Sequence, residues 1–131
     1  MPSIFTRIVS GEIPSHRVAE DEEFLAFLDI QPVRPGHTLV IPKREIDHFF
    51  DMDRELLSRV LVFSKPISSA IQTVTGAQRI GAIVAGFDVP HAHLHLIPVD
   101  SMAELDFGRA LPASPTELAD MAEKIRQAMA S

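Results

Sequence analysis

The sequence predicts an α+β domain with a mainly antiparallel sheet of about five strands, one long kinked helix and a C-terminal helix. Short apolar runs bounded by turn residues fill much of residues 16–42, as is typical of neighbouring strands. Residues 54–75 instead repeat apolar side chains every three or four positions, which indicates an amphipathic helix. The links around the apolar run at 89–99 are too short for parallel crossovers, which favours antiparallel pairing.

The N-terminal part begins with one or two helical turns at residues 4–9, which the turn signal SGEIPS ends. Strands are expected at 16–20, 24–30 and 37–42. The third of these follows an Arg-Pro-Gly turn and ends at Pro42, which cannot donate a hydrogen bond to a central ladder.

The long helix is expected from Arg54 to Thr75. Asp53 is a suitable N-cap and Gly76 a suitable C-terminal stop. Pro66 lies inside the helix, where proline costs about 3 kcal/mol if the helix stays straight. The apolar stripe keeps its phase on both sides of Pro66, so we expect one kinked helix rather than two.

The C-terminal part begins with a continuous apolar run at 79–86, which suits a buried strand. A short connection through Phe87–Pro90 leads to the strand that carries the histidines, and residues 100–113 are expected to be irregular. The last helix is expected to have Ser114 as its N-cap and Pro115 at its first helical position. Glu117 completes a capping box with Ser114. With no repeat and no long linker, residues 1–131 are expected to form a single domain.

Composition excludes several functions. Twelve basic and eighteen acidic residues give a net charge of −6, which argues against binding to nucleic acid or to an anionic membrane. The absence of cysteine removes disulfides, thiol catalysis and thiolate metal sites. No apolar run is long enough to span a membrane, and the N-terminus lacks the pattern of a signal peptide. We therefore expect a cytoplasmic protein.

The stretch VPHAHLHLIPV at 89–99 holds three of the six histidines at alternate positions. In a strand, His91, His93 and His95 share one face, because side chains alternate with a period of two. Three interpretations remain: a polar outer face, a metal site, or a catalytic row in which one imidazole is the nucleophile. Residues two apart on a strand are separated by roughly 6.6 Å, so three rings cannot easily converge on one ion. A metal site would need further ligands, such as His37, His48 or Asp88.

The run His91-Ala92-His93-Leu94-His95-Leu96-Ile97 resembles the histidine triad motif, in which three histidines alternate with apolar residues. The likeness extends over about residues 3–99 and is similar to the Hint-like branch of the histidine triad (HIT) superfamily. The resemblance implies a hydrolase or transferase acting on a purine nucleotide. Its members attack the α-phosphate of nucleoside phosphoramidates, such as adenosine phosphoramidates, or of related nucleotide esters.

The resemblance also implies roles for individual residues. His93 would be the nucleophile and would form a nucleotidyl-histidine intermediate that water resolves. His91 would orient His93 through its backbone carbonyl, and His95 would contact the phosphate and help to protonate the leaving group. His37 matches the family's supporting histidine. Attack requires a neutral imidazole, so activity is expected to fall below about pH 6.

Binding residues follow from the same resemblance. Asp29 matches the acid that binds the ribose hydroxyls, although by itself it could simply begin the turn QPVRPG. Gly86 would allow close approach of a ligand. Four apolar residues, which would otherwise pass as ordinary core, match the positions that sandwich the base: Phe5, Ile8, Phe27 and Ile30.

The chain also departs from the family pattern. Many members begin with a Cys-x-x-Cys that holds zinc with two histidines, whereas Ser3 and Thr6 stand here, so we expect no metal and no cofactor. Asp88 stands just before the triad, where many members have a hydroxyl, and a carboxylate there would repel a phosphate or change the substrate preference. Two alternatives therefore stay open: a metal-dependent hydrolase that uses the histidine strand, and a nucleotide-binding module without catalysis.

Members of this branch are usually homodimers joined through the long helix and a shared sheet. The resemblance thus implies a homodimer. Three phenylalanines could supply an apolar contact for it: Phe49, Phe50 and Phe63.

Overall fold

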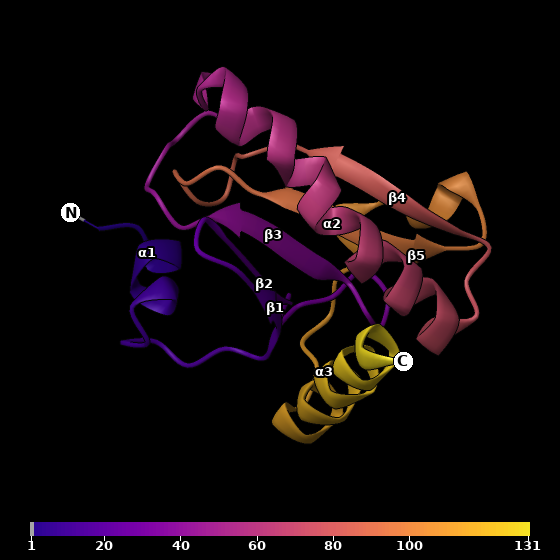
Figure 1. Ribbon diagram of the computed structural model, residues 1–131. Helices are drawn as coiled ribbons and strands as arrows, with labels where there is room; N and C mark the ends of the chain where they lie inside the picture. Colours follow the sequence, from indigo (N-terminus) through magenta and orange to yellow (C-terminus); the bar gives the residue numbers. More distant parts are fainter. Residues whose placement is uncertain (1) are drawn as a thin grey trace.

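The computed structural model describes residues 2–131, so Met1 lies outside it. Five strands form one antiparallel sheet in the order β1-β2-β3-β5-β4, which confirms the predicted α+β class (Figure 1). The helices and strands in chain order are α1 (Ile4–Val9), β1 (Arg17–Glu20), β2 (Phe24–Leu28), β3 (Thr38–Pro42), α2 (Arg54–Thr75), β4 (Arg79–Val84), β5 (Leu94–Val99) and α3 (Pro115–Ala130). Short 3₁₀ turns lie at Phe49–Asp51, Met102–Glu104 and Phe107–Arg109.

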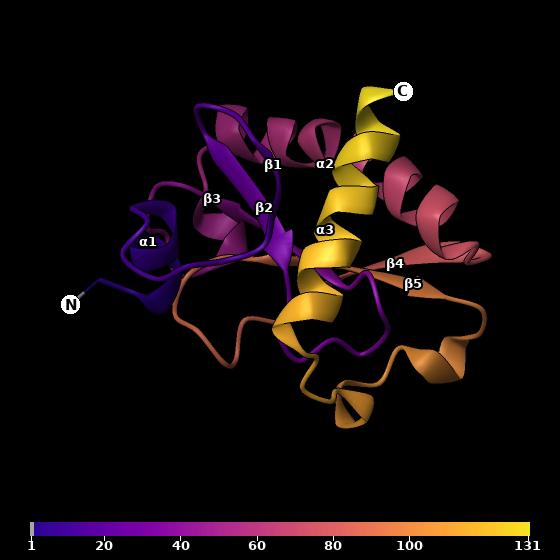
Figure 2. The same cartoon turned by 90° about the horizontal axis from the view of Figure 1, so that it is seen from below.

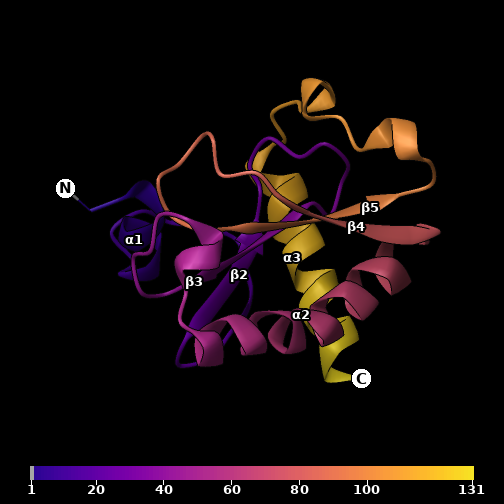
Figure 3. The same cartoon turned by 90° about the horizontal axis from the view of Figure 1, so that it is seen from above.

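The two long helices cover one face of the sheet (Figures 2 and 3). Side chains that alternate along β2 and β3, such as Phe24, Ala26 and Val40, point to this face and pack with the apolar stripes of α2 and α3. Ile71 of α2 and Ile125 of α3 are fully buried there. This layer is the main hydrophobic core.

The opposite face of β2 and β3 is covered by α1. Phe5 and Ile8 of α1 pack against the alternate residues of the same strands, including Phe27 and Leu39. Ser3 caps α1, because its hydroxyl accepts the backbone N–H of Thr6. Alternation within β2 and β3 therefore sends one set of side chains into the main core and the other toward α1.

The ends of the long helices are set by local side-chain chemistry, as the sequence predicts. Asp53 caps α2 by accepting the Leu56 N–H, and Gly76 ends it with a left-handed φ of 71°. Pro66 lies inside α2, and the two halves of the helix run in different directions (Figure 2). Ser114 and Glu117 form both hydrogen bonds of the capping box at the start of α3.

Two expectations about the C-terminal strands are wrong in part. The run at 79–86 is not a buried strand: β4 ends at Val84 and lies at the edge of the sheet, with most of its residues exposed or half-buried. A continuous apolar run therefore does not by itself imply that both faces of a strand are buried. The strand expected to carry all three histidines after Pro90 is shorter than expected, since β5 begins at Leu94.

The phenylalanines suggested as a dimer contact are used differently from one another. Phe63 packs against Phe24, with ring centroids 5.3 Å apart, and Phe49 belongs to the main core. Phe50 remains 75% exposed. Within residues 2–131, none of the helices combines the length and the apolar character needed to cross a membrane.

Candidate active site

The three histidines of the triad share one face, although only His95 belongs to a strand. His91 and His93 lie in the extended segment that leads into β5. Ala92 and Leu94 between them point into the main core, so the alternation continues beyond the strand's end. All three imidazoles are buried. This burial excludes the interpretation of the triad as a solvated outer face.

His93 is held by a hydrogen bond to its neighbour in the triad. Its Nδ1–H donates to the backbone carbonyl of His91 at 2.7 Å. The ring of Phe5 meets it edge to face, with centroids 5.2 Å apart. No residue among 2–131 forms a hydrogen bond with Nε2, the remaining ring nitrogen. That nitrogen keeps its lone pair, because the proton of the neutral ring is on Nδ1.

His95 is joined to His37 by a direct imidazole–imidazole hydrogen bond. Nδ1 of His37 accepts the backbone N–H of Val33 at 3.0 Å, and Nε2 of His37 lies 2.9 Å from Nδ1 of His95. A neutral imidazole has one N–H, so His37 must carry its proton on Nε2 and donate it to His95. His95 then carries its own proton on Nε2. The Val33 backbone thus sets the tautomers of both rings.

Burial keeps these two rings neutral. The pKa of His37 is lowered to about 3, chiefly by burial and to a smaller extent by the positive charge that His95 would carry. Burial likewise lowers the pKa of His95 to about 4, with a smaller effect from His93. Burial also lowers the pKa of His91. The N–H of His95 that is not used by His37 is therefore a neutral hydrogen-bond donor.

The same hydrogen bonds bear on the metal-site alternative. Asp29, His37 and His95 place possible ligand atoms within 4.8 Å of one another. Metal binding needs an imidazole lone pair, but His37 uses Nδ1 as an acceptor and has its proton on Nε2. A metal would have to break both hydrogen bonds of His37. The observed arrangement favours a hydrogen-bonded pair over a metal centre.

Asp29 directly follows β2 and faces the paired histidines. Its Oδ1 accepts the backbone N–H of Gln31 at 2.9 Å, so it does begin a turn. Its Oδ2 lies 3.7 Å from Nε2 of His37, which is no ion pair because His37 is neutral. Burial raises the pKa of Asp29. One carboxylate oxygen therefore remains free of backbone bonds near the triad.

A cavity of about 250 Å³ adjoins His93 and His95. Asp29 and all four apolar residues predicted to sandwich a base line it, namely Phe5, Ile8, Phe27 and Ile30. Ile30 is 63% exposed and forms part of the rim. Asp88 also lines the cavity, whereas Gly86 does not; its φ of 80° gives a conformational reason for glycine at that position.

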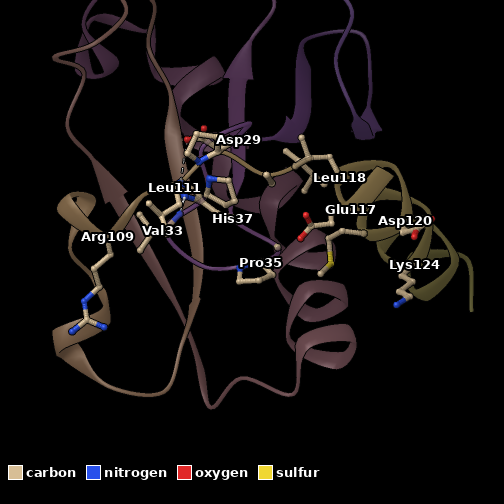
Figure 4. A pocket seen from close by; sticks show the side chains of 16 residues that line it. Asp29, Val33, Pro35, His37, Arg109, Leu111, Glu117, Leu118, Asp120 and Lys124 are labelled. Atoms are coloured by element: carbon tan, nitrogen blue, oxygen red, sulfur yellow. Dashed lines mark hydrogen bonds and ion pairs between the residues drawn. The ribbon is translucent and has the colours of Figure 1, made fainter. Parts of the chain in front are cut away.

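A larger cavity of about 500 Å³ lies between the 28–37 segment, residues 109–113 and α3. Figure 4 shows Asp29 and His37 at one end and the charged side chains of α3, among them Glu117 and Lys124, at the other. None of the triad histidines lines it. The smaller cavity is therefore the one that adjoins the triad.

Both ring nitrogens of His91 have hydrogen-bond partners. Its Nε2–H donates to the Pro42 carbonyl at 2.8 Å, and its Nδ1 lies 2.8 Å from the Ser3 hydroxyl. Ser3 and Thr6 are the residues that the resemblance places where a zinc-binding Cys-x-x-Cys was expected. Neutral hydroxyls are not zinc ligands of the usual kind, and His48 is 80% exposed. The residues present do not fit a zinc site.

Phe107 is a site residue that the sequence did not reveal. It lies in the 3₁₀ turn Phe107–Arg109, and its ring meets His95 edge to face, with centroids 4.8 Å apart. It also lies 6.4 Å from the His37 ring. Nothing in the irregular segment at 100–113 indicates this contact, because a single aromatic residue between turns has no periodicity to place it.

Comparisons with known proteins agree with this geometry. Residues 10–102 match the model of the HIT domain. An adenosine 5′-monophosphoramidase of Schizosaccharomyces pombe is 36% identical over 95% of this chain and 96% of its own. An uncharacterized HIT-like protein of Borreliella burgdorferi is 41% identical over 72% of this chain and 73% of its own.

Solved structures of similar proteins have the same fold. A Hit-like protein from Bartonella henselae has a TM-score of 0.86 at 35% identity, covering 96% of this chain and 95% of its own. A Zn-bound histidine triad family protein from Mycobacterium smegmatis has a TM-score of 0.83 at 31% identity, covering 97% and 92%. The motif, the fold and the family match agree, and this chain belongs to the HIT domain family.

Proposed function

We propose that this protein is a nucleotide hydrolase or transferase that attacks the α-phosphate of adenosine phosphoramidates or related purine nucleotide esters. The observation that carries the proposal is the state of His93. Its Nδ1–H is held by the His91 carbonyl, which leaves the Nε2 lone pair available in a ring that lines the cavity. The relative from Schizosaccharomyces pombe named as an adenosine 5′-monophosphoramidase supports the same class of substrate.

In the proposed complex the base lies between the apolar side chains of α1 and β2, represented by Phe5, Ile8 and Phe27. The free oxygen of Asp29 accepts hydrogen bonds from the ribose hydroxyls. These contacts place the α-phosphorus in front of His93. Positioning of this kind supplies much of the acceleration in phosphoryl transfer.

In the first step, Nε2 of His93 forms a bond to the α-phosphorus while the bond from phosphorus to the leaving group breaks. The His91 carbonyl stabilises the positive charge that develops on the ring. The Nε2–H of neutral His95 donates a hydrogen bond to the departing group, which takes its proton from an adjacent water molecule. In the second step, the hydroxide formed from that water attacks phosphorus and the phosphorus–nitrogen bond breaks, which returns His93 to its starting form.

Asp88 restricts the substrates that this site accepts. Its carboxylate lines the cavity together with Asp29, so two acidic groups face the bound nucleotide. Repulsion disfavours leaving groups with additional negative charge, such as further phosphates. The proposal therefore favours a leaving group that is neutral or carries an amine. A binding module without catalysis, the alternative that Asp88 also suggests, is separated from this proposal by the first experiment below.

We also propose that two copies associate through β4 and α2. The outer edge of β4 has no strand beside it within residues 2–131, and unpaired edges favour pairing with another chain. Leu61 and Val62 on α2 are 63% and 71% exposed, which is unusual for adjacent apolar residues of a helix that packs on a sheet. A homodimer joined at these elements covers both features.

The nucleophile is tested by the substitution His93→Ala. We expect turnover of an adenosine phosphoramidate to fall by at least about 10³-fold, because the covalent step is lost. Binding of AMP, measured by calorimetry, should change little. His48→Ala is the control, since that exposed ring lies outside the cavity. Wild-type turnover in His93→Ala contradicts the mechanism, and AMP binding by an inactive wild type supports the binding module.

The ribose contact is tested by comparing AMP with 2′,3′-dideoxy-AMP. The wild type should prefer AMP by about tenfold, the effect of a hydrogen bond to a charged group worth about 1.5 kcal/mol. Asp29→Ala should remove this preference and leave the affinity for the dideoxy nucleotide nearly unchanged. If calorimetry shows that the wild type and Asp29→Ala prefer AMP over the dideoxy nucleotide to the same extent, Asp29 does not bind the ribose and only stabilises the turn.

The neutral histidine pair is tested by the pH dependence of stability. The folded-state pKa values of about 3 for His37 and about 4 for His95 lie below the unfolded value near 6.5. The unfolded chain therefore binds more protons, and stability is complete above pH 6.5 and declines as the pH falls. Each ring removes up to about 1.4 kcal/mol per pH unit. Urea unfolding from pH 7 to pH 5 should show this decline, and His37→Gln should make it shallower. A free energy of unfolding that is constant over this range refutes the assignment.

The proposed dimer is tested by the double substitution Leu61→Glu and Val62→Glu. Charges buried at an interface are unfavourable unless they are paired, so the variant should have the molar mass of a monomer in light scattering. Leu111→Glu is the matched control, because Leu111 is 71% exposed and lies away from α2 and β4. A monomeric wild type, or an unchanged mass in the double variant, excludes this interface.

A further inference from the structure

We propose that Ser3 is a positioning residue for the nucleophile, acting through His91. The Ser3 hydroxyl donates to Nδ1 of His91. This bond holds the His91 ring and thereby the His91 backbone carbonyl, which accepts the hydrogen bond from Nδ1 of His93. Ser3 lies 88 residues from His91 in sequence and is the N-cap of α1. The inference rests on the proposed function only where catalysis is concerned, because the state of His91 can be measured separately.

The direction of each hydrogen bond follows from its partners. The Pro42 carbonyl can only accept, so His91 must carry a proton on Nε2. A neutral His91 then presents a lone pair on Nδ1, which requires a donor. Ser3 Oγ, at 2.8 Å, is that donor, and it simultaneously accepts the backbone N–H of Thr6. One hydroxyl thus caps α1 and satisfies a fully buried imidazole.

Glu45 keeps the competing donor away from His91. Thr6 Oγ1 lies 3.4 Å from Nδ1 of His91, but it donates to Glu45 Oε1 at 2.6 Å. The same carboxylate oxygen accepts the backbone N–H of Ser3 at 2.6 Å. These hydrogen bonds hold Glu45 in its charged form and lower its pKa. The Ser3 hydroxyl is therefore the group left to donate to His91, because its other possible acceptor, Thr6 Oγ1, lies farther away at 3.3 Å.

The connection to the nucleophile is short. The His91 carbonyl that accepts the Nδ1–H of His93 belongs to the residue whose ring Ser3 holds. Phe5, two residues after Ser3, contacts both rings, with centroids 5.8 Å from His91 and 5.2 Å from His93. Movement of His91 would change the direction in which Nε2 of His93 points. A small displacement of a nucleophile is enough to lower a reaction rate substantially.

The test uses Ser3→Gly, because glycine is tolerated at a helix N-cap and the variant should therefore fold. Ser114→Gly is the matched control: it removes the N-cap hydroxyl of α3, which contacts no histidine. Ser3→Thr is the conservative variant that keeps the hydroxyl. The ¹⁵N NMR signals of the His91 ring report its protonation state, and steady-state kinetics with an adenosine phosphoramidate report the effect on turnover.

In the wild type and in Ser3→Thr, His91 should be neutral with its proton on Nε2. In Ser3→Gly the Nδ1 signal should shift and the ring should titrate at a higher pH, because the donor that favours the neutral form is gone while Glu45 remains. Glu45 and His93 are the titratable groups that act on His91. In the same variant kcat should fall about tenfold with little change in KM, since orientation and not binding is affected.

The outcomes separate this inference from the proposed function. A wild type that carries the His91 proton on Nδ1, or identical ring signals in Ser3→Gly, overturns the role of Ser3. Equal losses of kcat in Ser3→Gly and Ser114→Gly also overturn it, because the effect is then one of helix capping. If the wild type has no activity but the ring signals change as expected, the hydrogen bond stands and the proposed reaction fails.

Discussion

The site depends on one constraint: a neutral imidazole has one nitrogen that donates and one that accepts, so the partner of one nitrogen decides the state of the other. Backbone groups determine which nitrogen carries the proton in the four histidine rings of the site. The Val33 N–H fixes His37, and His37 in turn fixes His95, whereas the carbonyls of Pro42 and His91 fix His91 and His93. Tautomers that are ambiguous in isolated histidines are thus determined by the fold.

Strand pairing in the sheet brings these backbone groups close to one another. β3 and β5 pair so that Leu39 stands opposite His95, which brings the loop before β3, with His37, beside the triad. The extended segment before β5 places His91 against the end of β3 at Pro42. The long helices contribute indirectly, because they bury the other face of these strands and fix the register.

The distribution of charge distinguishes this site from a general phosphate-binding pocket. His37 and His95 are neutral, and Asp29 and Asp88 are acidic, so the cavity contains little fixed positive charge to attract an anion. In the proposed complex, recognition therefore comes from neutral N–H donors and from apolar contact with the base. Such a site gives specificity through geometry more than through electrostatic attraction.

The sequence by itself determined the elements, because their signals are local: helix caps at Asp53 and Ser114, the stripe of α2, and the alternation around His93. It also indicated the family, since the motif is contiguous. The tertiary structure alone decided which residues meet. Ser3, Glu45 and Phe107 join the histidines through contacts between distant segments, and β4 lies at the edge although its apolar run resembles that of a central strand. Periodicity encodes which face a residue occupies, but strand order and loop packing arise from the whole chain, so no local pattern records them.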